Sequence, residues 1–163
     1  MNKIQISVVI PAYNEEKFLP KCLKSLKRQK TSLKYEIIVV NNNSKDKTGE
    51  VAKKHKVKVI NEKKQGVGQA RKTGTENAKG EIIVHVDADT IVFPDYLEKI
   101  WAHFEKDKKL VCLGGQFLFY DAPFLEKFTQ KMPLPYYLFL WQSSVKRRTW
   151  PNGWKHGIQK RHL

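Results

Sequence analysis

Short β-branched apolar runs alternate along the chain with longer stretches in which apolar residues recur at helical spacing. The apolar runs predict buried strands at residues 3–10, 35–40, 57–60, 81–86 and 110–119. The periodic stretches predict helices at residues 15–29, 47–55 and 66–78, with a further helix beginning near Pro94. This alternation of strand and helix predicts an α/β fold with a doubly wound, mostly parallel sheet flanked by helices.

Two prolines mark boundaries within this pattern. The first strand is expected to end at Pro11, because proline lacks the N–H that a central strand donates. Pro20 lies inside the helical pattern of residues 15–29, where it marks either a kink or the first turn of a helix that begins later.

The strand–helix rhythm stops near Asp121. We therefore expect one domain over residues 1–121, followed by a basic, aromatic C-terminal segment over residues 122–163. After Glu126 the sequence contains lysines and arginines but no aspartate or glutamate. Trp141, Trp150 and Trp154 lie among these cations. Aromatic rings beside cations suit a membrane surface, so this segment is a candidate for peripheral membrane contact.

The composition narrows the classes of protein only a little. The 163 residues carry a formal net charge of +15, which attracts nucleic acid, anionic lipid or phosphorylated ligands, or simply marks a lysine-rich solvated surface. No nucleic-acid-binding motif accompanies the charge. Cys22 and Cys112 lie outside any CxxC pattern, which favours a reducing, cytoplasmic location over a disulfide framework or zinc site. No secretory signal and no apolar run of membrane-spanning length are visible.

The sequence Asp87-Ala88-Asp89 follows directly after the predicted strand at residues 81–86. The carboxyl end of a parallel strand is where open α/β sheets bind ligands. Paired acids there raise each other's pKa, and a divalent cation with a phosphate group would remove that cost. Taken alone, the triplet is more typical of a solvated turn than of a functional site.

Polar or glycine-rich sequences also follow the other three strands. Tyr13, after the first strand, could flank a base, and Asn14 or Glu15 could cap the next helix. The run 41–44 could contact a base or ribose, or could form an Asx turn and helix cap. Gly66-Val67-Gly68 precedes Arg71 at a helix start that suits an anion, although neither a complete GxGxxG nor a P-loop is present. Four such strand ends together indicate a nucleoside diphosphate held by a metal and backbone amides.

These four blocks, over residues 4–120 and in this order, resemble family 2 glycosyltransferases of the GT-A fold. The resemblance implies a Rossmann-like GT-A sheet that is incomplete at its C-terminal end. It also implies a UDP- or GDP-sugar donor, Mg²⁺ or Mn²⁺, and transfer of the sugar to an acceptor, with inversion. The acceptor is left open between a lipid-linked molecule and a polysaccharide, and the location is expected at the inner face of the membrane.

The resemblance also assigns roles to individual residues. The donor-binding residues that it implies are Pro11, Ala12, Tyr13, Glu15, Asn41, Asn42, Arg71, Asp87 and Ala88. Asp89 would bind the metal that bridges the phosphates, and Asp87 would face the ribose or sugar. Asn41 and Asn42 stand where the family commonly has acids that contact the base.

The catalytic base is unknown from the sequence. In inverting members a carboxylate well beyond the DxD block deprotonates the acceptor. Here Asp121 and Glu126 are the acids beyond Asp107, and neither lies in a recognisable version of that block. A truncated or frameshifted product, a fragment of a longer enzyme, and a divergent transferase whose base comes from elsewhere all fit this pattern.

Three functional hypotheses follow. The first is an active transferase, and the second is a catalytically inactive nucleotide-sugar-binding module. The third is a basic module that binds anionic membranes, which is compatible with either of the others.

Overall fold

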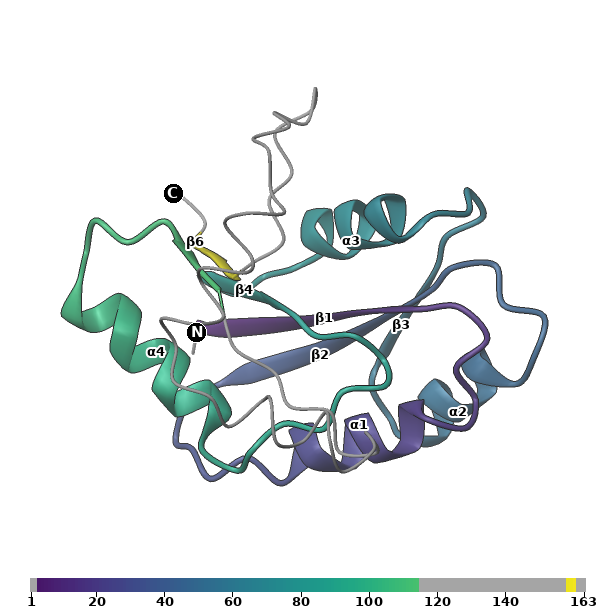
Figure 1. The fold of residues 1–163 in the computed structure, drawn as a ribbon, viewed down its shortest axis with the longest axis horizontal. Helices are drawn as coiled ribbons and strands as arrows, with labels where there is room; N and C mark the ends of the chain where they lie inside the picture. The colour runs from purple at the N-terminus through teal and green to yellow at the C-terminus, as the bar shows by residue number, and fades with distance from the viewer. Residues whose placement is uncertain (1–2, 115–157, 161–163) are drawn as a thin grey trace, which may run out of the picture. The chain divides into compact units, whose positions relative to one another are not determined.

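The computed structural model describes residues 3–114 and 158–160. The strands form one sheet in the order β3-β2-β1-β4-β6-β5 (Figure 1). Their bounds are Ile6–Ala12 (β1), Tyr35–Asn41 (β2), Lys58–Asn61 (β3), Ile82–His85 (β4), Cys112–Leu113 (β5) and Ile158–Lys160 (β6). Strands β1 to β4 pair in parallel, as the alternating sequence pattern predicted.

Helices cover both faces of this sheet. Helices α1 (Leu19–Lys27), α2 (Thr48–Lys54) and α4 (Tyr96–Lys106) lie on one face, and α3 (Val67–Glu76) lies on the other (Figure 1). The expected doubly wound α/β architecture is therefore confirmed. Helix α1 has Pro20 in its first turn, so the later-starting helix is the correct one of the two interpretations of that proline.

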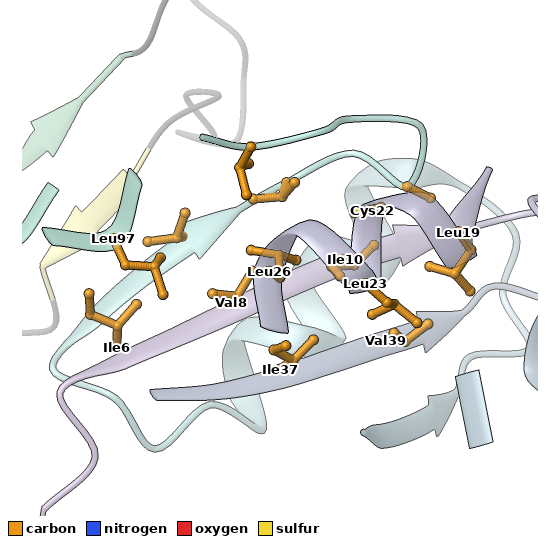
Figure 2. Packing of buried hydrophobic residues seen from close by; sticks show 14 of the residues in the cluster. Ile6, Val8, Ile10, Leu19, Cys22, Leu23, Leu26, Ile37, Val39 and Leu97 are labelled. Atoms are coloured by element: carbon orange, nitrogen blue, oxygen red, sulfur yellow. The ribbon is translucent and has the colours of Figure 1, made fainter. Parts of the chain in front are cut away.

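Alternation along the strands decides which side chains meet which helices. Ile6, Val8 and Ile10 of β1 pack with the apolar residues of α1 and α4 in the larger core cluster (Figure 2). Val9, between them, packs with Ala70 of α3 in the smaller cluster on the opposite face. Both faces of the strand are thus buried, which explains its nearly continuous apolar sequence.

Helix α3 approaches the sheet unusually closely at Gly74. A Cβ atom built on Gly74 would lie 2.2 Å from Cγ1 of Val9. The absence of a side chain at this position lets the backbone in the last turn of α3 pack directly against β1.

The expectation that the first strand ends at Pro11 is wrong. Strand β1 continues to Ala12, and Pro11 is in register with Val40 of β2. Pairing with β4 ends earlier, at Val9 and His85, where Val86 N–H donates to the carbonyl of Val9. Because successive residues alternate their direction, the side of Pro11 that lacks an N–H faces β4 beyond its last pair. No donor is needed there.

The strand order places a reversal between β1 and β4. The chain moves outward from β1 through β2 to β3 and then crosses to β4 on the other side of β1. In open α/β sheets such a reversal leaves a crevice at the carboxyl ends of the two strands, where ligands bind. Pairing with β4 ends before the carboxyl end of β1, and we call the edge of the sheet between the ends of these two strands the crevice.

The C-terminal part of the unit contains a strand that the sequence did not predict. Strand β6 pairs antiparallel with both β4 and β5, and residues 1–113 and 157–163 form one compact unit. Strand β5 is the described part of the strand expected at residues 110–119. The rest of that strand, and the basic segment 122–163 apart from β6, lie outside the described residues, so the proposed boundary at residue 121 stays a prediction.

Within residues 3–114 and 158–160, no helix combines the length and hydrophobicity needed to cross a lipid bilayer.

Candidate functional site

The loops that follow β1, β2, β3 and β4 all lie at the carboxyl edge of the parallel sheet. Parallel pairing of these strands brings their carboxyl ends to the same edge. Each of the four polar blocks found in the sequence therefore lies at this edge, around the crevice between β1 and β4.

Asp87 forms an ion pair with Arg71 across this crevice. The Arg71 Nη2 and Asp87 Oδ1 atoms are 2.7 Å apart, and the side chains are 15% and 60% exposed, respectively. Arg71 lies in the middle of α3, so the pair joins the loop after β4 to that helix. The arginine is largely buried, while the carboxylate still faces solvent.

His85 is the last residue of β4 and lies two residues before Asp87. Its Nε2 atom is 3.4 Å from the hydroxyl oxygen of Thr75 on α3. The half-buried imidazole thus packs against α3, the helix whose Arg71 pairs with Asp87.

The residue between the two acids anchors them to the core. Ala88 is 3% exposed and belongs to the larger apolar cluster, whereas Asp87 and Asp89 are both exposed. Thr90 N–H donates to the carbonyl of Asp87 at 3.0 Å, which closes the turn. The buried Ala88 therefore anchors the turn, while the carboxylates on either side of it stay exposed to solvent.

Cys22 of α1 lies beneath this turn. Its Sγ atom is 3.6 Å from the carbonyl oxygen of Asp87. Burial, followed by the negative charges of Asp89 and Asp87, raises the pKa of the Cys22 thiol to about 12. The thiol therefore stays protonated, and Cys22 is a residue of the buried core.

Four acids contribute negative charge at the crevice. Burial raises the pKa of Glu15, and the charges of Asp89, Asp46 and Asp87 raise it further. Carboxylates that repel one another in this way favour a cation between them.

The donor set fits a hard divalent ion that is shared with a phosphorylated ligand. Among the described residues, no group of three His, Cys, Asp or Glu side chains could hold a metal ion alone. Mg²⁺ is commonly held by one or two carboxylates together with substrate phosphates and water. Asp89, exposed at the crevice, suits the carboxylate ligand of such an ion.

Hydrogen bonds clamp the loop after β1 to the loop after β2. Asn14 accepts a hydrogen bond from Lys45 N–H and donates its own N–H to Ser44, with distances of 2.8 and 3.1 Å. Glu16 accepts from Lys47 N–H, and its own N–H donates to Asp46. The clamp fixes both loops relative to each other before any ligand binds.

The helix caps expected from these loops are not formed as predicted. Phe18 and Lys47 occupy the N-cap positions of α1 and α2, and neither helix start has a side-chain cap hydrogen bond. The Asn14 side chain bonds across to the neighbouring loop instead. The sequence pattern correctly identified turn-forming residues, but side chains such as those of Asn14 and Asp46 bond to the neighbouring loop rather than capping a helix.

Asn42 uses its whole amide within the protein. It is 3% exposed, donates to the carbonyls of Glu62 and Lys64, and accepts from Gly66 N–H at 2.8 Å. Asn42 thereby shapes the loop between β3 and α3, including Gly66, whose φ of 142° favours glycine. A direct contact of Asn42 with a base stays a prediction.

Asn41 is less constrained. It is half-buried, donates to the side-chain oxygen of Asn61 and accepts from Ser44 N–H. Its contacts involve another side chain and a loop amide rather than buried carbonyls, so the Asn41 amide is the better placed of the two to meet a ligand.

Glu62 is a site residue that the sequence analysis missed. Its carboxylate accepts hydrogen bonds from Thr73, Lys64 N–H and Gln69, and these bonds lower its pKa, that from Thr73 most strongly. Glu62 follows β3, so the rule that strand ends carry ligands or their supports could have identified it. Through Gln69 and Thr73 it ties the β3 strand end to α3.

Pro11, Ala12 and Tyr13 form the wall contributed by β1. Pro11 and Ala12 are buried in the strand, whereas the Tyr13 ring is 41% exposed. A ring at this edge is available for stacking against a planar ligand. The two buried residues set the position of the backbone rather than offering side-chain groups.

A mostly parallel sheet with a strand-order reversal, covered by helices on both faces, places the protein in the doubly wound, Rossmann-like α/β class. The family described as Glycosyl transferase family 2 matches residues 7–160. The chain therefore belongs to glycosyl transferase family 2, and the resemblance read from the four motifs is confirmed.

A curated relative supports this membership. The glycosyltransferase GlyA of Streptococcus pneumoniae is 32% identical over 123 residues, which cover 72% of this chain and 18% of GlyA. The chain thus spans under a fifth of the length of this relative, and the activity of the whole relative does not transfer directly.

Solved structures confirm the GT-A fold. S. aureus TarS 1–349 in complex with UDP-GlcNAc gives a TM-score of 0.59 at 28% identity, covering 63% of this chain and 31% of that TarS chain. The Pyrobaculum calidifontis mannosyltransferase PcManGT, in complex with GDP-Man and Mn²⁺, gives 0.62 at 24% identity, covering 66% and 34%. The second likeness shows the fold alone.

Proposed function

We propose that this chain binds a nucleotide-diphosphate sugar with a divalent metal and transfers the sugar to an acceptor with inversion. The observation that carries the proposal is the convergence of Glu15, Asp87 and Asp89 with Arg71 at the crevice between β1 and β4. A binding site for a metal–diphosphate explains why acids and an arginine gather at one sheet edge.

The metal site is assigned to Asp89. Its carboxylate is exposed at the turn held by buried Ala88, and oxygen ligands of this kind suit Mg²⁺ or Mn²⁺. When bound, such an ion supplies Lewis-acid stabilisation of the departing diphosphate. Burial and the neighbouring acids raise the pKa of Glu15, so an added positive charge would favour its ionised form.

The donor pocket is assigned to the walls around this ion. Tyr13 stacks on or flanks the base, and Pro11, Ala12, Glu15 and Asn41 line the nucleoside side. Arg71 orients Asp87 toward the ribose or sugar through their ion pair. UDP and GDP both remain candidate donors, and the complex of TarS with UDP-GlcNAc supports testing UDP-GlcNAc first.

Binding of UDP-GlcNAc and GDP-mannose, measured calorimetrically with and without Mn²⁺, tests the proposal. We expect the metal to be required for tight binding of one donor, and Asp89→Ala to abolish the metal-dependent part. Glu105→Ala is the control, because Glu105 is an exposed acid near the end of α4 that pairs with Lys108. Absence of metal-dependent binding for every nucleotide diphosphate tested would overturn the proposal.

A second candidate is a binding module that holds the donor without transferring it. It is favoured by the sequence beyond Asp107, where Asp121 and Glu126 are the acids and neither lies in a recognisable acceptor-side block. Donor hydrolysis or transfer that disappears in Asp87→Asn would establish an enzyme. Intact donor binding without any turnover, across lipid-linked and polysaccharide acceptors, would establish the module.

The setting of the reaction forms part of the same proposal. We assign the chain to the cytoplasm, at the inner face of the membrane, with a lipid-linked or polysaccharide acceptor. The support is the basic composition of segment 122–163 and its interleaved tryptophans. Nucleic acid is not a proposed partner, since the charge comes without a recognition motif.

A further inference from the structure

A groove of about 330 Å³ lies between α1 and the segment that follows the acid pair. Its lining residues are Lys21, Lys24, Ser25, Arg28, Ile91, Val92 and Pro94. The cations Lys21 and Lys24 of α1 and Arg28 at its C-cap recur at spacings of three and four residues, so they lie along one side of the helix. Figure 1 shows the chain between β4 and α4 running along this helix.

Hydrogen bonds fix the segment at residues 91–94 against α1. Val92 N–H donates to the Ser25 hydroxyl at 3.1 Å, and the Gln29 amide donates to the carbonyl of Phe93 at 2.7 Å. The carbonyl of Pro94 accepts from Lys30 N–H at 2.7 Å. The segment is therefore held in place by its backbone, with the Val92 side chain in the core.

This anchoring leaves two large apolar side chains in water. Ile91 is 48% exposed and Phe93 is 70% exposed, on either side of buried Val92. Two exposed apolar groups on a well-fixed loop next to cations are characteristic of a surface that meets a partner.

The positive charge beside these residues is not neutralised within the described part of the chain. Lys21, Lys24 and Arg28 form no ion pair with any described residue. No acid occurs in the sequence between Glu16 and Glu36, which contains this whole helix.

The acids at the start of α4 have other partners. Asp95 pairs with Lys99 at 2.7 Å, and Glu98 accepts a hydrogen bond from Thr31. The groove therefore presents a net positive rim next to an apolar edge.

We propose that this surface, Lys21, Lys24 and Arg28 with Ile91 and Phe93, docks on an anionic lipid membrane. The cations would meet lipid phosphates, while the isoleucine and the aromatic ring would enter the headgroup–acyl boundary. A soluble phosphate would use the cations but not the exposed apolar pair. This membrane contact would require neither donor binding nor the C-terminal basic segment.

Docking through this surface would hold the acid pair at the membrane. Ile91 is two residues after Asp89, and Cys22, on the buried side of α1, contacts the carbonyl of Asp87. A chain bound by this loop and helix therefore presents its crevice close to lipid headgroups, where a lipid-linked substrate would be.

Sedimentation of the full chain with vesicles tests the proposal. The vesicles contain phosphatidylcholine alone or phosphatidylcholine mixed with phosphatidylglycerol. Each cation at an anionic surface contributes about fivefold in binding, so Lys21→Gln/Lys24→Gln/Arg28→Gln is expected to weaken binding to the mixed vesicles on the order of a hundredfold. Ile91→Ser/Phe93→Ser is expected to weaken it about tenfold or more with all charges kept.

The matched control removes the same charge elsewhere. Lys3→Gln/Lys72→Gln/Lys79→Gln changes three exposed lysines outside the groove and is expected to retain most of the binding. Equal losses in the two charge variants, or full binding by the Ile91/Phe93 variant, would overturn the proposal. So would failure of the unmodified chain to bind mixed vesicles, or displacement of vesicles by inorganic phosphate at equal concentration. Unchanged circular dichroism establishes that each variant is folded.

Discussion

Arg71 restrains Asp87 at the mouth of the crevice. The two atoms of the ion pair are 2.7 Å apart, the arginine is largely buried, and the carboxylate is 60% exposed. An ion pair with one exposed partner adds only about 0–1 kcal/mol to stability. Its main effect is therefore on the direction in which Asp87 points, and a ligand that needs this direction will depend on Arg71.

Replacing Arg71 should separate stability from donor binding. We expect Arg71→Met to change the free energy of unfolding by about 1 kcal/mol or less, in line with an exposed pair. Nucleotide-sugar affinity should fall about tenfold, since a charge-assisted bond at the site contributes roughly 1.5 kcal/mol. Urea denaturation and calorimetry measure the two quantities.

Lys99→Met supplies the control for this experiment, because Lys99 forms an exposed ion pair with Asp95 on α4. It should leave donor affinity unchanged. Equal donor affinity in the Arg71 variant and the unmodified chain would contradict the orienting role.

Asn41 and Asn42 illustrate what the sequence could and could not predict at the residue scale. Both stand in the second block and received the same expected role from the resemblance. The structure separates them, since Asn42 points its NH₂ group at two backbone carbonyls while Asn41 meets a side-chain oxygen. Sequence position alone carries no information on which of two adjacent amides faces inward, because that depends on the loop from β3.

Introducing a carboxylate at each position tests this separation. Asn42→Asp sets an acid against the carbonyls of Glu62 and Lys64 and removes both donors, so we expect a loss of about 2–3 kcal/mol in unfolding free energy. Asn41→Asp should cost under about 1 kcal/mol, because the Asn61 amide can rotate to donate and Ser44 N–H still donates. Denaturant titration of the two variants gives the comparison, and equal losses would refute it.

At the scale of elements, the loops after β1 and β2 act as one unit. Asp46 accepts hydrogen bonds from Glu16 N–H and Thr48 N–H, and Thr48 in turn accepts from Glu15 N–H. Burial alone would raise the pKa of Asp46, but the bonds from Thr48 and Glu16 outweigh it and leave the pKa below its ordinary value. The ionised form of Asp46 therefore holds the clamp together.

The pH dependence of stability should report this clamp. Because the folded-state pKa is lowered, the contribution of Asp46 is fully present above its ordinary pKa of 3.8 and is lost as the pH falls through the folded value. We expect Asp46→Asn to be less stable near pH 7 and to lose less stability on acidification below about pH 4. Thermal unfolding across this range measures both effects.

The control is Glu105→Gln, which removes one exposed carboxylate outside the clamp. It should leave the acid limb of the curve close to that of the unmodified chain. An Asp46 variant whose acid limb has the same slope as the parent would contradict the clamp.

The elements themselves were largely predictable because their signals are local. Apolar β-branched runs marked the four parallel strands, and helical periodicity marked α1 and α4. The predicted end of β1 was wrong because the rule that excludes proline from central strands does not apply at Pro11, where pairing with β4 has already ended. Strand β6 was missed because its three residues form a strand only through pairing with β4 and β5, which lie far away in the sequence.

At the scale of the whole molecule, charge opposes compactness. The chain carries a net charge of +15, and the stretch between Glu16 and Glu36 contributes cations without a single acid. Like charges held close together in a folded chain repel one another, and this lowers stability relative to the expanded state. Anionic ligands bound at the carboxyl edge and at the groove beside α1 would reduce this repulsion and so stabilise the folded chain.

Salt should therefore stabilise the isolated chain. Between 0.01 M and 0.15 M the screening length falls from about 30 Å to about 8 Å, which weakens repulsion across the molecule while sparing contacts at 3 Å. We expect the Tm to rise over this interval in NaCl and to rise less in Lys21→Gln/Lys24→Gln/Arg28→Gln, whose groove has lost three of the repelling charges. Scanning calorimetry measures both, with Lys3→Gln/Lys72→Gln/Lys79→Gln as the charge-matched comparison. A Tm that stays flat or falls with NaCl would show that local ion pairs outweigh the net charge. A smaller salt effect in the groove variant than in its matched control would locate the repulsion beside α1, where an anionic surface would relieve it.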